Sequence, residues 1–169
     1  MKIAVLNGSP RKENTAAMVE AFRQGAEAAG HTVEVLHVGK MKINGCLGCE
    51  YCHTKGEGQC VQKDDMGQVI DAYKRADMIV FASPIYYSAL TAQLYAAIQR
   101  MYCIGKPAAA KAALLLSTAS GQTDAAEAYF KQITGFLGME SCGVCKVVGD
   151  DNQKAEKMEE IKAWAATIK

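Results

Sequence analysis

Short apolar runs alternate along the chain with longer segments in which apolar residues recur at helical spacing. The runs are rich in β-branched residues and predict five strands, at Lys2–Leu6, Thr32–Val38, Asp77–Ser83, Lys111–Ser117 and Cys142–Val148. The periodic segments predict five helices, at about 14–29, 64–75, 91–103, 122–137 and 153–168. This alternation indicates an α/β fold, a parallel sheet with helices on both faces.

The pattern also indicates where some strands lie in the sheet. Asp77–Ser83 and Lys111–Ser117 are continuously apolar, as in strands covered on both faces, whereas Thr32–Val38 alternates and suits a position nearer the edge. No repeat, low-complexity tract or linker divides the chain, so we predict one domain over residues 1–169. The Cys- and Gly-rich stretch 44–60 has neither periodicity and is predicted to be a loop inserted after the second strand.

Composition and charge narrow the choice of partners and compartment. With 19 basic and 18 acidic residues, the formal charge of +1 gives no reason to expect nucleic acid or an anionic membrane as a partner. No apolar run approaches the roughly 20 residues of a membrane helix, and the first residues resemble a strand rather than a signal peptide. We therefore expect the seven cysteines in a reducing cytoplasm, where they indicate metal, cluster or redox chemistry more often than structural disulfides.

The loop after the first strand has the features of a phosphate site. Ligands of an open, doubly wound sheet bind beyond the carboxyl ends of its strands. Here Gly8–Thr15 leads straight into a helix, whose N-terminus offers free N–H groups and a positive dipole end. Ser9, Asn14 and Thr15 add donors, and Arg11 adds a charge. Neither GxxxxGK[ST] nor GxGxxG is present, so the loop is sized for a single phosphate, and an ordinary capped turn is the alternative.

The loop after the third strand carries exposed aromatic candidates. It contains Pro84, Ile85, Tyr86 and Tyr87. Two adjacent tyrosines at a strand exit suit a flat apolar ligand whose ring lies against backbone and aromatic surface. The alternative is that one tyrosine packs under the next helix while the other lies on the surface.

The loop after the fourth strand consists of small residues, Thr118, Ala119, Ser120 and Gly121. Such residues let the backbone approach a ligand closely, and their N–H groups can donate to a carbonyl-rich ring edge. Small polar loops are common, so this loop supports a ligand site only together with the other two.

Four cysteines of the predicted insertion form a C-x₂-C-x₂-C-x₇-C run, at Cys46, Cys49, Cys52 and Cys60. In a helical or tightly turned segment, the first three thiols lie on one side. The run is close to that of bacterial ferredoxins, with a longer last gap and Val61 in place of proline. Three interpretations stay open: an iron–sulfur cluster, thiols that pack beneath a loop, and a zinc site, with or without His53, or a reversible disulfide.

The remaining cysteines are predicted to be packing residues. Cys142 and Cys145 are three apart on a strand, so we expect them to face opposite sides of the sheet and to share neither a metal nor a disulfide. Cys103 lies on its helix and is predicted to be buried or to lie in an interface.

Together, the opening LNGSPRKENT, the central SPIYYSALTAQLYAAIQR and the STASG loop resemble the NAD(P)H-dependent FMN reductase branch of the flavodoxin-like superfamily. The similarity extends over nearly the whole chain. It implies a three-layer sandwich with strand order 2-1-3-4-5, and FMN as the cofactor. In relatives the matching positions surround the phosphate, the ribityl chain with the isoalloxazine, and the ring's other edge; here these are Ser9, Arg11, Asn14 and Thr15, then Pro84, Ile85, Tyr86 and Tyr87, then Thr118 to Gly121.

The cysteine loop resembles the compact motif of iron–sulfur flavoproteins, which bind a [4Fe–4S] cluster on this same fold. The resemblance implies Cys46, Cys49, Cys52 and Cys60 as ligands, with electrons passing from a ferredoxin-type donor through the cluster to FMN. Relatives of the reductase branch usually form dimers or tetramers with the flavin near an interface. The segment Leu90–Tyr102, apolar on more than one face, is consistent with a homodimer or homotetramer.

These observations predict an FMN-dependent oxidoreductase that passes electrons from NAD(P)H to a quinone, a flavin or another small acceptor. FMN itself carries the chemistry, so no catalytic side chain is expected. Two alternatives remain, an iron–sulfur flavoprotein and a non-catalytic redox sensor that uses its thiols on the same fold.

Overall fold

The computed structural model describes all residues, 1–169. Its strands are β1 (Lys2–Asn7), β2 (Thr32–Leu36), β3 (Met78–Pro84), β4 (Lys111–Thr118) and β5 (Glu140–Val148). Its helices are α1 (Asn14–Ala28), α2 (Met66–Arg75), α3 (Ala92–Gln99), α4 (Asp124–Leu137) and α5 (Ala155–Ala166). Short 3₁₀ segments are η1 (Val38–Lys40), η2 (Tyr51–His53), η3 (Arg100–Ile104) and η4 (Gly149–Gln153). Every strand and helix predicted from the pattern is present.

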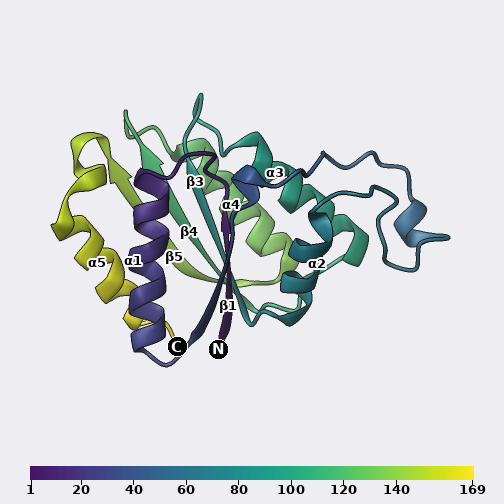
Figure 1. Ribbon diagram of the computed structural model, residues 1–169, viewed down its shortest axis with the longest axis horizontal. Coiled ribbons are helices and arrows are strands. Elements are labelled where there is room, and N and C mark those ends of the chain that lie inside the picture. The colour runs from purple at the N-terminus through teal and green to yellow at the C-terminus, as the bar shows by residue number, and fades with distance from the viewer.

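The strands form a parallel sheet of order β2-β1-β3-β4-β5. The helices α1 and α5 cover one face, and α2, α3 and α4 cover the other (Figure 1). This is the flavodoxin-like arrangement implied by the resemblance, and the predicted fold is confirmed. None of the helices has the length and apolar character that crossing a membrane requires.

Each face of the sheet has its own hydrophobic core. A cluster of 24 buried residues lies beneath α2, α3 and α4, and one of 16 lies beneath α1 and α5. The central strand β3 contributes to both, with Ile79 and Phe81 in the larger cluster and Met78 and Val80 in the smaller. All of its residues are buried, which explains its uninterrupted apolar sequence.

Two predicted elements end earlier than the pattern indicates. The strand expected to reach Val38 ends at Leu36, because Val38 begins η1. There, a Cβ on Gly39 would lie 2.3 Å from the carbonyl oxygen of Ser9, so only glycine allows this approach to the first loop. The helix expected over 91–103 ends at Gln99 and continues as η3, which closes at Gly105 with a φ of +71°.

A β-bulge in β5 overturns one expectation from the sequence. Ala112 pairs with Ser141 and Leu114 pairs with Val144, so β5 contains one residue more than β4 over this step. The extra residue interrupts the period of two, and Gly143 adopts a φ of +120°. As a result Cys142 and Cys145 both pack against the core beneath α1 and α5. The prediction that they face opposite sides is wrong, whereas their role as packing residues is consistent with these contacts.

Candidate functional site

Hydrogen bonds tie the loops after β1 and β3 to each other and to the last residues of β3 and β4, at the carboxyl edge of the sheet. The Gly8 N–H donates to the carbonyl of Ala82 at 2.8 Å, and the Thr91 hydroxyl donates to the carbonyl of Gly8 at 2.9 Å. The Ile85 N–H donates to the carbonyl of Ser117 at 2.9 Å. The loops after β1 and β3 and the end of β4 are therefore held together where doubly wound sheets bind ligands.

Two hydroxyls of the first loop hold its shape. The Ser9 hydroxyl accepts from the Arg11 N–H at 3.2 Å, while the Ser9 N–H donates to the Asn7 side chain at 2.9 Å. The Thr15 hydroxyl lies 2.7 Å from that of Ser117, and both residues are buried. Ser9 thus shapes the first loop through local bonds, and Thr15 ties the start of α1 to the end of β4.

The N-terminus of α1 presents free donors beside this loop. Glu13 precedes the helix, and no side chain caps it. The N–H groups of Asn14, Thr15 and Ala16 donate to no atom of the chain. Unsatisfied N–H groups and the positive end of a 15-residue helix suit an anion.

Two of the predicted phosphate contacts are side chains that reach solvent. Arg11 is exposed and lies 3.6 Å from the carboxylate of Glu13, a surface pair that contributes little to stability. Asn14 is half-buried, and Gln153 donates weakly to its side-chain oxygen at 3.5 Å. Both side chains are therefore free to turn toward a bound anion at small cost.

The loop after β3 ends in a strained turn. Tyr86 and Ala89 exchange backbone hydrogen bonds of 3.0 and 3.1 Å, and between them Tyr87 and Ser88 have φ values of 49° and 63°. This is a type I′ turn, which ordinarily selects Asn and Gly because other residues are strained there. Tyr86 is 42% exposed and Tyr87 is fully exposed, so neither packs under the next helix.

The other two candidates of this loop belong to the scaffold. Pro84 is the last residue of β3 and is buried, and Ile85 packs against the larger core cluster. Their side chains are committed to the protein, so a ligand at this edge would meet the backbone here and the two tyrosines beyond it.

The loop after β4 is held from beneath by Asn152 of η4. Its amide donates to the carbonyl of Thr118 at 3.0 Å and to that of Gly149 at 2.7 Å, and its buried side-chain oxygen has no partner. The Thr118 hydroxyl accepts from the Gly121 N–H at 3.3 Å, while Ala119 and Ser120 are exposed. Sequence reasoning missed Asn152, because a lone asparagine between a strand and a helix has no distinctive pattern.

Sequence reasoning also missed Gly8 and Thr91 as partners. Thr91 caps α3, accepting from the Leu94 N–H at 3.3 Å, and a Cβ on Gly8 would lie 2.6 Å from the Thr91 hydroxyl oxygen. A threonine before a helix is a recognisable cap. Its second contact, with a residue 83 positions away, has no signal in a single sequence.

A second region, which we term the cysteine pocket, lies at the other end of α3. All four predicted thiols line one small cavity of about 20 Å³: Cys46, Cys49, Cys52 and Cys60. Cys103 of η3 lines the same cavity, although the sequence indicated only a packing role for it. Cys46 and Cys49 are exposed, and Cys52 and Cys103 are buried. No three Cys, His, Asp or Glu side chains lie close enough to hold a single metal ion.

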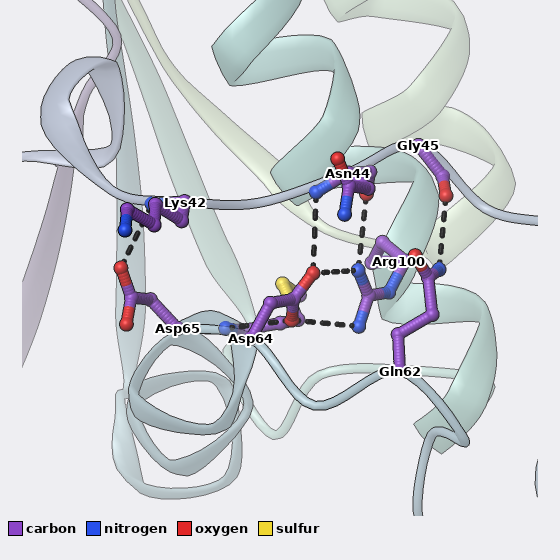
Figure 2. Close-up of polar contacts among 8 residues, drawn as sticks. Lys42, Asn44, Gly45, Gln62, Asp64, Asp65 and Arg100 are labelled. Carbon is purple, nitrogen blue, oxygen red and sulfur yellow. Dashed lines mark hydrogen bonds and ion pairs between the residues drawn. The ribbon is translucent and has the colours of Figure 1, made fainter.

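The base of the cysteine loop is tied to η3 by a buried ion pair (Figure 2). Arg100 donates to both carboxylate oxygens of Asp64, at 2.8 and 3.1 Å, with side chains only 1% and 7% exposed. Arg100 also donates to the carbonyl of Asn44 at 3.0 Å, and Asp64 accepts from the Asn44 N–H at 3.2 Å. The pair therefore links both ends of the loop to the end of α3.

Further hydrogen bonds close the same base (Figure 2). The Gln62 side chain donates to the carbonyl of Gly45 at 3.0 Å. Asp65 accepts from the Lys42 N–H at 2.8 Å through its side chain and donates to the Lys42 carbonyl at 3.0 Å through its own N–H. Residues 42–45 and 62–65 thus run side by side, and the segment between them projects from the body of the protein (Figure 1).

Burial and charge oppose each other in this region. Burial disfavours the charged guanidinium of Arg100. The interactions of the guanidinium with Asp64 and with the nearby Cys60 outweigh the effect of burial and raise the pKa of Arg100. Burial likewise opposes ionisation of Asp64, yet its hydrogen bonds to Arg100 and the backbone hold its pKa below the ordinary value. Burial raises the pKa of Cys52 and Cys103, which favours their neutral thiols.

Known proteins similar to this chain include FMN reductases and iron–sulfur flavoproteins. The family model described as NADPH-dependent FMN reductase matches residues 1–153. The chain is 42% identical to an iron–sulfur flavoprotein of Archaeoglobus fulgidus over 106 residues, which are 62% of the chain and 47% of that protein. It is 30% identical to an iron–sulfur flavoprotein of Methanocaldococcus jannaschii over 158 residues, which are 92% of the chain and 79% of that protein. The match spans about half the length of several such relatives, 44–52%.

A solved structure extends the comparison to the fold. An FMN-dependent NADH-azoreductase from Bacillus anthracis, in complex with FMN, superposes with a TM-score of 0.69. The match covers 98% of each chain at 15% identity, so it shows a shared fold alone.

Proposed function

Because the chain belongs to the NADPH-dependent FMN reductase family, we propose that it binds FMN at the carboxyl edge of its sheet and passes electrons from NAD(P)H to a small acceptor. Family membership supports a flavin-dependent oxidoreductase; the cofactor site and the acceptor are inferred from the chain's own residues. One observation supports it most directly: the loops after β1 and β3 are held by hydrogen bonds to each other and to the end of β4, beside an uncapped helix N-terminus.

The residues at this edge fit FMN. The free N–H groups at the start of α1, with Arg11 and Asn14, would hold the phosphate, while Ser9 and Thr15 keep the loop in shape. The residues proposed for the ribityl chain and the ring are Pro84, Ile85, Tyr86 and Tyr87, with Thr118, Ala119, Ser120 and Gly121 at the other ring edge. Bound FMN supplies the hydride and single-electron chemistry, and the side chains bind and orient it.

The overall reaction balances with a quinone as acceptor. NAD(P)H loses a hydride, and the quinone gains two electrons and two protons, one of them from solvent. The test is FMN titration of the protein followed by NAD(P)H oxidation with quinone, free flavin and no acceptor. Tight FMN binding and acceptor-dependent oxidation are expected. A protein that refuses added FMN would contradict the proposal and favour a thiol-based sensor.

A second candidate, an iron–sulfur flavoprotein, is favoured by the convergence of the four predicted thiols on one pocket. Their chemistry fits a [4Fe–4S] cluster, which is held by four cysteine thiolates, each on a different iron. A single zinc ion would need its sulfurs within about 2.3 Å of one point, and no three side chains are so arranged. Cys46, Cys49, Cys52 and Cys60 would hold the cluster, which would exchange single electrons between a ferredoxin-type donor and FMN.

Iron and labile sulfide, measured on anaerobically purified protein together with its visible spectrum, separate the two candidates. Flavin bands without iron indicate a simple FMN reductase, whereas iron and sulfide in cluster stoichiometry indicate the electron-transfer protein. In that case NAD(P)H oxidation should be slow and reduction by ferredoxin fast.

We also propose a homodimer or homotetramer in a reducing cytoplasm, as expected from the sequence. The fully exposed Tyr87 beside the proposed flavin site supports an assembly that covers it. Sedimentation of the FMN-loaded protein tests this, and a monomer at micromolar concentration would contradict it.

A further inference from the structure

The buried arginine beside the cysteine pocket has a donor that the protein leaves unused. Arg100 is 2% exposed, and its two terminal nitrogens are engaged by Asp64 and Asn44. Its Nε–H is buried without any hydrogen-bond partner. Buried donors in folded proteins are almost always hydrogen-bonded, and leaving one unpaired on a charged group is especially unfavourable, so we expect an acceptor beside this Nε–H.

Cys60 is the cysteine best placed to provide that acceptor. Arg100 and Cys60 line the cysteine pocket together, and they also line a neighbouring cavity of about 520 Å³ between the cysteine loop and α2. Cys60 lies four residues before Asp64, the other partner of the guanidinium. A neutral thiol is a weak acceptor, whereas a ligating thiolate carries charge and accepts a charge-assisted hydrogen bond.

We propose that Arg100 is a positioning residue for the iron–sulfur cluster: its Nε–H donates to the sulfur of Cys60 and fixes the fourth ligand. The inference rests on the proposed iron–sulfur function. Asp64 holds the guanidinium by its terminal nitrogens, which leaves the Nε edge free for the sulfur. Hydrogen bonds to cluster sulfurs favour the more negative, reduced state, so this contact raises the reduction potential.

Arg100→Lys tests the inference, because it keeps the positive charge for Asp64 but lacks Nε. Arg75→Lys is the matched control. Arg75, the last residue of α2, makes an exposed ion pair with Glu34 of β2 at 3.4 Å. The readouts are iron per protein, and the cluster potential from an EPR-monitored redox titration. We expect the reduction equilibrium constant of the Arg100→Lys cluster to fall about tenfold, equivalent to about 59 mV for one electron. Arg75→Lys should match the parent protein.

If Arg100 only stabilises the fold, removing the buried pair should leave the cluster potential unchanged in a variant that still folds. Arg100→Met combined with Asp64→Asn removes both charges of the buried pair with little change of volume and leaves no unpaired buried charge. In this folded protein the potential should fall as in Arg100→Lys. Loss of iron from either folded variant, with iron kept in Arg75→Lys, would also support the positioning of Cys60.

Two outcomes overturn the inference, and they can be told apart. An unchanged potential and iron content in both Arg100 variants would contradict the role of Arg100 while leaving the iron–sulfur function intact. An iron-free parent protein, purified anaerobically or reconstituted with iron and sulfide, would overturn the iron–sulfur function and this inference with it.

Discussion

The carboxyl edge of the sheet and the cysteine pocket are built in contrasting ways. At the edge, hydrogen bonds hold the loops after β1 and β3 to each other and to the end of β4, and Ser9 and Thr15 are 4% and 2% exposed. The cysteine loop is tied to the body of the protein at its base and by the Tyr102 hydroxyl, which donates to Glu50 at 2.9 Å, and two of its four predicted ligands are exposed. The fold therefore preorganises the proposed flavin site, whereas two of the four thiols proposed to hold a cluster lie at the surface.

The two regions lie at opposite ends of the same helix. Thr91, at the start of α3, contacts Gly8 of the first loop, and Arg100, just beyond its end, lines the cysteine pocket. A helix of 8 residues is about 12 Å long, which sets the scale of the separation within one chain. Changes in one region should thus leave binding in the other largely intact.

The largest expected effect is loss of the proposed cluster from a cysteine variant. Cys60→Ser should lose most of its iron, because a hydroxyl is a poor ligand for iron compared with a thiolate. Cys103→Ser is the matched control, since Cys103 lines the same pocket but lies outside the four-cysteine run. It should keep its iron, and both variants should bind FMN normally. Iron analysis and FMN titration measure this; equal iron loss in both would show that Cys103 is also a ligand.

The next largest effect concerns the base of the cysteine loop. Asp64→Ala leaves Arg100 buried without its partner and should lower the free energy of unfolding by about 3–5 kcal/mol. Glu34→Ala, which breaks the exposed pair with Arg75, should cost less than about 1 kcal/mol. Urea unfolding monitored by circular dichroism gives both values. Similar small losses of stability in the two variants would mean that the buried Arg100–Asp64 pair does not anchor the cysteine loop.

The same ion pair predicts a dependence of stability on acid. The folded-state pKa of Asp64 lies below its ordinary value, so its contribution is present above the unfolded pKa of about 3.9. It is lost as the pH falls through the lower, folded pKa. Asp64→Asn should therefore unfold with less pH dependence than the parent protein below about pH 4. Parallel acid titrations of the two proteins would contradict this.

A smaller effect is expected at the proposed phosphate site. Replacing Arg11 and Asn14 together with Ala should weaken FMN binding roughly 10- to 100-fold, because each hydrogen bond to a charged group contributes about 1.5–3 kcal/mol and solvent reduces this at exposed side chains. Riboflavin, which lacks the phosphate, should bind as before. Arg23→Ala, on the exposed face of α1, is the control. Equal losses for FMN and riboflavin would remove the phosphate assignment.

The sequence predicted the carboxyl edge better than the cysteine pocket for a physical reason. A parallel sheet brings the loops after β1, β3 and β4 to one edge regardless of their details, so a pattern of strands is enough to locate them. The order of the strands followed from the family resemblance. Contacts that depend on long-range packing, such as Thr91 with Gly8 or Asn152 with Thr118, leave no trace in local spacing.

The cysteine run predicted four thiols in one place but not what anchors them. Arg100 and Asp64 are 36 residues apart, and each has an ordinary local sequence, so only the structure reveals the pair. The helical context of Cys103 indicates only a packing role, and its place in the cysteine pocket is seen only in the structure. The prediction that Cys142 and Cys145 face opposite sides is wrong for a similar reason, since a single added residue in β5 reverses the face without changing the apolar pattern.

The smallest effect tests whether the carboxyl edge is strained as well as preorganised. Ser88 has a φ of 63° at the second central position of a type I′ turn, where glycine is preferred. Ser88→Gly should therefore raise the free energy of unfolding by about 0.5–1 kcal/mol, the relief of a left-handed backbone less the entropy cost of glycine. Ala89→Gly, next in the chain and without a positive φ, should instead lower stability. Thermal unfolding with and without FMN measures both. If Ser88→Gly stabilises the free protein more than the FMN complex, FMN binding relieves part of the strain in the turn. A loss of stability in both variants would mean that the turn is not strained.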